Sequence, residues 1–131
     1  QAAAALGREH GVRILIGPIN PADMPGYFLT RPEDALQVIE EIGERPLGLL
    51  YDVYHAQMER GALTDTLEDA MGHLGHVRIA GVPGRRTLTR LAIEPSLRDN
   101  LIMILVMKPQ VVQMTVSGRG AGFGQRGIIL A

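Results

Sequence analysis

The chain has 131 residues, 46% of them hydrophobic, which is enough for one domain with a real core. It has no cysteine, which excludes a disulfide framework and thiolate chemistry and is typical of a cytoplasmic protein. The net charge of −1 gives no reason to expect nucleic acid or an anionic membrane as a partner. The longest apolar run, residues 101–107, is far shorter than the about 20 residues that a membrane-spanning helix needs.

The charge is divided unevenly along the chain. Residues 1–85 carry seven arginines, twelve acidic residues and all four histidines, whereas residues 86–131 carry six basic and two acidic residues. The first part also alternates between strand and helix patterns, and the second does not. We therefore divide the chain at Arg85 into a patterned unit, residues 1–85, and a divergent tail, residues 86–131.

The first part begins with the pattern of a helix followed by a strand. Residues 1–7 are rich in alanine, lack the features of a signal peptide and are predicted to be the last turns of a helix. The apolar run 12–16, bounded by glycine and by Gly-Pro, predicts a buried strand. After a loop over residues 20–27, we expect a helix that Thr30 caps, with Pro32 in its first turn and Gly43 at its end.

Two more strands follow. Residues 47–51 form an apolar run that predicts the second strand, and residues 77–80 predict the third, with an exit loop at 81–85. Between them, residues 63–74 carry apolar side chains at helical spacing. Strands separated by helices of this length predict βα units with a parallel sheet and right-handed crossovers.

Ligands of parallel α/β proteins gather at the carboxyl ends of the strands, where three segments qualify: residues 17–20, 52–55 and 78–85. Asp52 ends an apolar strand, and a carboxylate there needs a cation, which a divalent metal also touching His55 would supply. Alternatively, Asp52 caps the turn and His55 forms local hydrogen bonds. Arg85, in a Pro-Gly loop, either binds an anionic substrate group or is solvated.

Two further motifs are interpreted as structural. His73 and His76 are expected at a helix end before a strand, opposite the candidate site, where the helix carboxyl terminus favours them. Residues 122–127 fit G-x-G-x-x-G, but no room for a helix follows them, so we treat the match as chance.

Four strings carry a resemblance to a known family. Pro18-Ile19-Asn20, Asp-Met-Pro-Gly-Tyr at 23–27, Asp52-Val53-Tyr54-His55 and the ten residues 76–85 resemble the hydroxypyruvate isomerase family, one of the xylose isomerase-like barrels. The resemblance covers about residues 7–85. A complete barrel needs about 250 residues. The implied fold is therefore a partial (β/α)8 TIM barrel, with about three βα units and an irregular carboxyl-terminal tail, as in a fragment of a longer protein.

The resemblance implies an intramolecular oxidoreductase, which isomerises hydroxypyruvate and tartronate semialdehyde or a related small oxo-acid. In the family, two Glu, an Asp and a Gln or His hold a divalent metal (Mg or Mn), and the two Glu move the proton. Asp52 matches the Asp ligand, and His55 and Arg85 match substrate-contacting positions. Gly17 stands at the first Glu position and Arg78 at the Gln or His position, and the tail has no counterpart of the last Glu. The expected site is therefore defective, with no intact catalytic residue and no tight metal binding.

Two classes of function remain: an isomerase by descent, or a non-catalytic barrel remnant or binding module. The expected partner is a small hydroxy-carbonyl substrate, and exposed strand edges predict self-association. The change of pattern at Arg85 suggests a shifted reading frame, and the alternative is a genuine insertion or a different carboxyl-terminal unit. We expect residues 101–107 in this tail to be poorly ordered.

Overall fold

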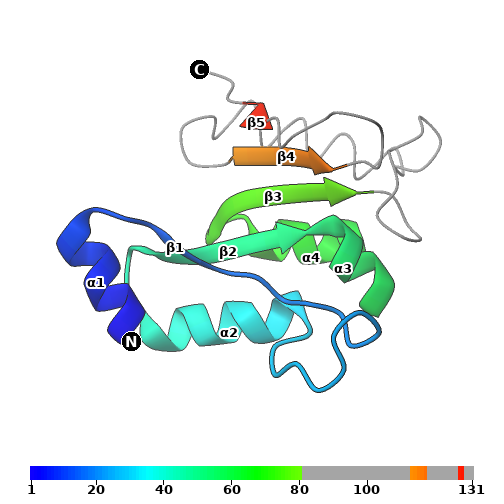
Figure 1. Cartoon of the computed structure of the whole chain (residues 1–131), viewed down its shortest axis with the longest axis horizontal. Coiled ribbons are helices and arrows are strands. Elements are labelled where there is room, and N and C mark those ends of the chain that lie inside the picture. Colours follow the sequence, from blue (N-terminus) through cyan, green and yellow to red (C-terminus); the bar gives the residue numbers. More distant parts are fainter. Residues whose placement is uncertain (81–112, 118–126, 129–131) are drawn as a thin grey trace.

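The computed structural model describes residues 1–80 with their side chains and residues 113–117 and 127–128 as backbone. It has one sheet and four helices in this part of the chain, in the order α1 (Ala2–His10), β1 (Ile14–Ile16), α2 (Pro32–Ile42), β2 (Leu47–Asp52), α3 (Val53–Glu59), α4 (Leu63–Ala70), β3 (Leu74–Ala80), β4 (Gln113–Ser117) and β5 (Gly127–Ile128). The sheet order follows the chain from β1 to β5 (Figure 1). Strands β1 to β4 are parallel, and β5 is antiparallel to β4.

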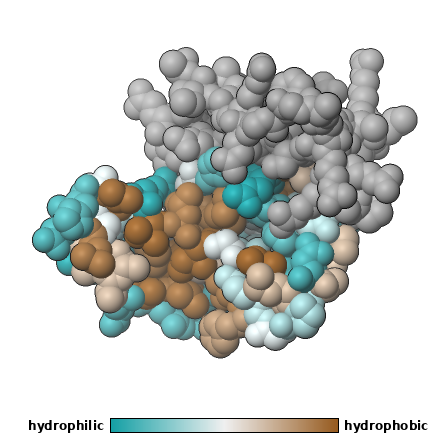
Figure 2. All heavy atoms as spheres, in the orientation of Figure 1, coloured by the Kyte–Doolittle hydropathy of each residue, from teal (hydrophilic) through white to brown (hydrophobic). Residues whose placement is uncertain are grey.

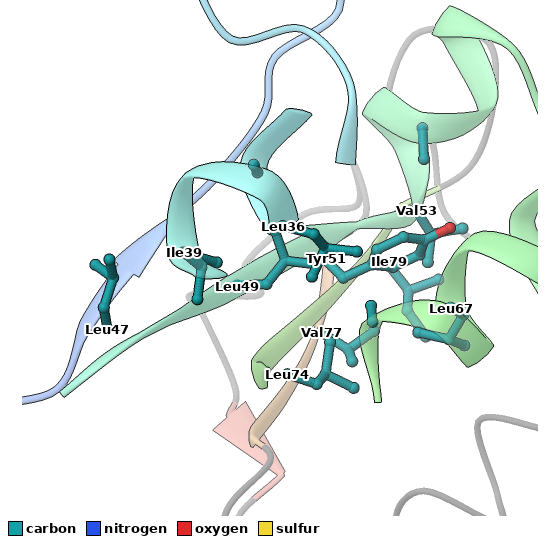
Figure 3. Packing of buried hydrophobic residues seen from close by; sticks show 13 residues of the cluster. Leu36, Ile39, Leu47, Leu49, Tyr51, Val53, Leu67, Leu74, Val77 and Ile79 are labelled. Carbon is teal, nitrogen blue, oxygen red and sulfur yellow. The ribbon is translucent and has the colours of Figure 1, made fainter. Parts of the chain in front are cut away.

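The main hydrophobic core lies between the sheet and the helices that cover one of its faces. Every second residue of β2 points into it, as do Leu74, Val77 and Ile79 of β3, where the register with β2 shifts, and these meet apolar residues of α2 and α4 (Figure 3). Tyr51, in the middle of this core, is fully buried, and its hydroxyl donates a hydrogen bond to the Leu63 carbonyl oxygen at 3.1 Å. This hydrogen bond ties β2 to the first residue of α4, one residue before Asp52 at the end of the strand.

The opposite face of the sheet, which would be the inner face of a barrel, is lined by the other set of alternating residues. Near its amino end the Arg13 side chain crosses β2 and β3 and donates to the Leu74 carbonyl oxygen at 3.2 Å. Gly48 and Gly75 leave room for this side chain, because neither has a Cβ atom. A Cβ atom on Gly48 would lie 2.9 Å from Arg13 Nη2, and one on Gly75 would lie 3.1 Å from Arg13 Cζ. Farther along this face come Leu50 and then, at the carboxyl end, the polar residues described below.

The helix ends differ in part from those predicted. Gly11 and Gly43 end α1 and α2 in the left-handed conformation, with φ of 64° and 65°. Pro32 begins α2, as expected, but the prediction that Thr30 caps it is wrong. The cap residue is Arg31, which makes no side-chain cap hydrogen bond and instead pairs with Asp34.

The predicted parallel α/β fold with three βα strands is confirmed for the described residues. The region expected to form one helix before β3 contains two, α3 and α4, separated by Gly61 and Ala62, both with positive φ. The sequence did not indicate β4 and β5 in the tail. The exit loop 81–85, the run 101–107 and most of the glycine motif 122–127 lie outside the described residues. Within the described residues, no helix is long and apolar enough to cross a membrane.

Candidate functional site

Asp52 ends β2 and begins α3. Its side chain is only 3% exposed. Oδ1 accepts hydrogen bonds from the backbone N–H groups of Tyr54 at 3.0 Å and His55 at 3.5 Å, so the carboxylate caps the helix. The local hydrogen bonds considered as the alternative to a metal are therefore present. They use one carboxylate oxygen and leave Oδ2 directed to other groups.

His55 lies in the first turn of α3 and is held by the loop after β1. Its Nδ1 lies 3.3 Å from the backbone nitrogen of Asn20 and 2.7 Å from Asn20 Nδ2. Asn20 Oδ1 accepts the N–H of Asp23 at 2.9 Å, which orients the amide so that its NH₂ group faces the imidazole. Because both groups that meet Nδ1 are donors, Nδ1 accepts and the ring proton of the neutral imidazole lies on Nε2.

Arg78 brings a positive charge to the same carboxylate. It lies opposite Asp52 in the register of β2 and β3, and its Nη1 is 3.6 Å from Asp52 Oδ2. His55 Nε2 lies 3.9 Å from the same oxygen. The guanidinium is partly accessible, with 37% of the Arg78 side chain exposed. Two donor groups, one permanently charged, therefore converge on one buried carboxylate oxygen.

Gly17 directly follows β1, at the same end of the sheet. A Cβ atom built on it would lie 3.0 Å from Leu50 Cδ2, so the aliphatic side chain of Leu50 occupies the space next to this position. Gly17 and Arg78 thus provide no carboxylate and no neutral metal ligand at the two positions named from the resemblance. In the part of the chain that the structure describes, no group of three or more His, Cys, Asp or Glu side chains is arranged to hold a metal ion.

Asp23 and Tyr54 are site residues that the sequence analysis did not single out, and Asn20 was included there only as the end of the candidate segment 17–20, without a role of its own. Tyr54 donates its hydroxyl to Asp23 Oδ1 at 3.3 Å, and its ring meets that of His55 edge to face. Asp23 Oδ2 lies 3.9 Å from His55 Nδ1. All three residues occur in the strings that carried the family resemblance, which was the signal available for them.

The structure corrects the placement of one histidine and leaves one arginine untested. His76 lies within β3, on the same side as Arg78 two residues later, so the prediction that it sits at a helix end was wrong. His73 does lie in the turn after α4, where its Nε2 is 3.6 Å from Glu40 Oε1. Arg85 lies outside the described residues, and its contact with substrate stays a prediction.

A parallel sheet with polar side chains gathered at the carboxyl ends of three successive strands places the chain among the parallel α/β proteins whose ligand sites lie at the strand ends, a class that includes the α/β barrels. The family described as xylose isomerase-like TIM barrel matches residues 1–120, and the chain belongs to this family. The match continues beyond Arg85.

Two curated relatives of this chain are named as isomerases. A 2-oxo-tetronate isomerase of Cupriavidus necator is 42% identical over 83 residues, and the hydroxypyruvate isomerase of Escherichia coli is 39% identical over 83 residues. Each alignment covers 63% of this chain and 32% of the relative. The chain therefore spans about a third of the length of the curated relatives it matches.

Solved structures share the fold. The family 2 AP endonuclease of Brucella melitensis has a TM-score of 0.67 at 31% identity, covering 79% of this chain and 39% of that one. A D-psicose 3-epimerase of Clostridium cellulolyticum H10, solved with D-tagatose, has a TM-score of 0.73 at 14% identity and covers 92% of this chain and 40% of that one. At that identity the second likeness concerns the fold alone.

Proposed function

We propose that this chain derives from an isomerase of small hydroxy-carbonyl acids and does not itself catalyse the isomerisation. The reaction of that isomerase would interconvert hydroxypyruvate and tartronate semialdehyde or act on a related oxo-acid. The names of the relatives support the substrate class. The absence of cysteine favours a cytoplasmic location.

The ion pair between Arg78 and Asp52 supports the loss of catalysis. An isomerisation of this kind moves a proton between neighbouring carbons, which needs a base, and stabilises negative charge on oxygen, which a metal supplies in the implied family mechanism. Gly17 has no side chain to act as the base. The guanidinium of Arg78, 3.6 Å from Asp52, puts a fixed positive charge where the implied metal would bind. The residues present therefore do not fit the metal.

Proton exchange tests this proposal directly. The full chain is incubated with hydroxypyruvate and Mg²⁺ in D₂O, and proton NMR follows both tartronate semialdehyde and the loss of carbon-bound protons. We expect neither to exceed the rate without protein, whereas the Escherichia coli hydroxypyruvate isomerase, as positive control, produces both. Product formation that scales with the concentration of this chain would contradict the proposal.

Metal dependence separates the two functional classes. A ligand that binds only the folded protein raises its melting temperature. If the chain is a non-catalytic remnant or a binding module, millimolar Mn²⁺ or Mg²⁺ leaves the melting temperature unchanged. A rise that EDTA reverses would favour an isomerase with a working metal site. Asp52 already accepts hydrogen bonds from the backbone of α3 and pairs with Arg78, which supports an unchanged melting temperature.

A further inference from the structure

A cavity of about 430 Å³ lies at the opposite end of the sheet from Asp52, where the strands begin and α2 ends (Figure 1). Its lining comes from Arg13 before β1, from the last turn of α2 and the loop to β2, and from Gly72 and His73 before β3. We propose that this cavity binds a small organic phosphate. The site shares no residue with the one at the carboxyl ends of the strands, so it stands or falls separately from the proposed loss of catalysis.

The charges around the cavity favour an anion. Glu44 pairs with Arg8 of α1, and Glu40 Oε1 lies 3.6 Å from His73 Nε2, so each acidic residue of the lining has a basic partner. The two other charged residues of the lining are arginines. With Arg8, three arginines therefore stand against two glutamates, and the net charge is positive even when His73 is neutral. A positively charged recess raises the local concentration of anions.

One of these arginines is already held in position. Arg13 Nη2 donates to the Leu74 carbonyl oxygen at 3.2 Å and lies 3.5 Å from that of His73, both at the start of β3. Gly48 and Gly75 leave the space in which the guanidinium lies. Because the side chain is oriented before a ligand arrives, little conformational entropy is lost when it contacts an anion.

The placement of the basic groups favours a phosphate over a carboxylate. Arg13 precedes β1, Arg45 precedes β2 and His73 precedes β3, and all three line the cavity. A phosphate group presents three acceptor oxygens in different directions, whereas a carboxylate presents two in one plane. Donors that come from three separate segments therefore match the phosphate group better.

The size of the cavity indicates that the ligand carries more than its phosphate. A volume of about 430 Å³ lies in the usual range for sites that bind small organic molecules. Part of the lining is apolar, because it includes the side chains of Ile39 and Leu47. We therefore expect a phosphate monoester with an apolar group to bind better than inorganic phosphate.

Titration of the full chain with phenyl phosphate tests the proposal. Benzoate and benzyl alcohol are the comparison probes, because they keep the ring but carry a planar carboxylate or no charge. We expect Kd for phenyl phosphate to be at least about threefold lower than Kd for benzoate or for inorganic phosphate, and no saturable binding of benzyl alcohol. In ¹H–¹⁵N spectra, phenyl phosphate should shift the amides of residues 43–47 and 72–73 and leave those of residues 52–55 in place.

Two variants locate the site. Arg45→Gln should raise Kd for phenyl phosphate at least about threefold, because it removes a charged donor. The matched control is Arg60→Gln, at an exposed arginine that pairs with Glu33, and it should leave Kd unchanged. Gly72→Leu adds bulk to the cavity wall without a clash, because nothing lies within 4 Å of its Cβ position and its φ is not positive. It should also weaken binding.

The alternative role of the arginines is to compensate the negative end of α2, which ends at Gly43 in the cavity wall. In that case Arg45→Gln lowers the melting temperature, and the chain does not bind phenyl phosphate. Circular dichroism checks that each variant is folded. No binding of phenyl phosphate, an equal Kd for benzoate, amide shifts at residues 52–55 in place of 43–47, or equal effects of Arg45→Gln and Arg60→Gln would overturn the proposal.

Discussion

Asn20 connects the loop after β1 to the first turn of α3, and it has no accessible surface. Its side chain contacts His55 at 2.7 Å and accepts the N–H of Asp23 at 2.9 Å. Replacing it by alanine removes the amide contact with buried His55 and the acceptor of the Asp23 N–H, while the backbone N–H of residue 20 still donates to His55 Nδ1. We therefore expect Asn20→Ala to lower the free energy of unfolding by about 1–3 kcal/mol.

Urea denaturation measures this change. Gln37→Ala is the matched control, because Gln37 is exposed on α2 and bonds only to Glu41 in the contacts seen, so its replacement should stay within about 0.5 kcal/mol. An equal effect of the two substitutions would show that Asn20 contributes no more than a surface amide.

Tyr51 predicts a loss of stability in alkaline solution. Burial in the core raises its pKa far above the usual value near 10, and the negative charge of Glu33 adds to this shift. Above pH 10 Tyr51 ionises in the unfolded chain but stays protonated in the folded chain. Ionisation therefore stabilises the unfolded state relative to the folded state. Stability is unaffected below this pH and then falls by up to about 1.4 kcal/mol per pH unit from this one group.

Denaturation curves between pH 8 and 11 check the sign and the slope. Tyr51→Phe removes the titrating group, and also the hydrogen bond to Leu63, so it should be less stable at pH 8 but lose less between pH 10 and 11. Tyr27→Phe, at an accessible tyrosine, should keep the slope of the unaltered chain. An unchanged slope in Tyr51→Phe would exclude Tyr51 as its source.

At the scale of the elements, the inner face of the sheet depends on glycine. A Cβ atom on Gly75 in β3 would lie 2.4 Å from Leu15 Cδ2 and 3.1 Å from Arg13 Cζ. Gly75→Ala should therefore push aside the ends of the Leu15 and Arg13 side chains, which cross β2 at this point, and cost about 1 kcal/mol of stability. Gly72→Ala is the control, because nothing lies within 4 Å of its Cβ position. Thermal melts compare the two, and a smaller loss for Gly75→Ala than for Gly72→Ala would contradict this packing.

Strands β1 to β3 could be predicted because each is a short apolar run bounded by turn residues, a signal local to the sequence. The helix α3 could not, because residues 53–56 are all buried and show no helical period. Leu74 fits the helical spacing of α4 but belongs to β3, where pairing with β2 decides its structure. Asp52 was predictable as an acid at a strand end, whereas the contact of Asn20 with His55 joins residues 35 apart.

At the scale of the whole molecule, the division at Arg85 stays a prediction. The family match continues to residue 120, and β4 extends the sheet parallel to β3. Both observations are expected if the tail is a genuine carboxyl-terminal unit. Sequencing the encoding DNA with its flanks separates the alternatives. A shifted frame predicts that another frame after Arg85 encodes a strand ending in Glu. If no frame does, the tail is a genuine part of the protein.

The open edge of β1 predicts self-association. Within the described residues, β1 has β2 as its one strand neighbour, and its three residues are only partly buried. Figure 2 shows apolar surface in the centre of the face where Figure 1 places β1. An edge strand with free backbone groups and apolar neighbours pairs readily with another chain, which buries both. We expect the average mass in solution to exceed that of the monomer and to rise with concentration.

Light scattering coupled to gel filtration measures that mass, and two lysine substitutions locate the contact. Leu15→Lys places a charge in the middle of β1, on the face away from the helical core, which contains Ile14 and Ile16. It should shift the population toward monomer, because a charge on an edge strand opposes pairing. Leu6→Lys adds the same charge to an exposed position of α1 and should leave the association intact. If the unaltered chain is a monodisperse monomer, β1 is not an associating edge. If both substitutions act equally, net charge rather than β1 controls association.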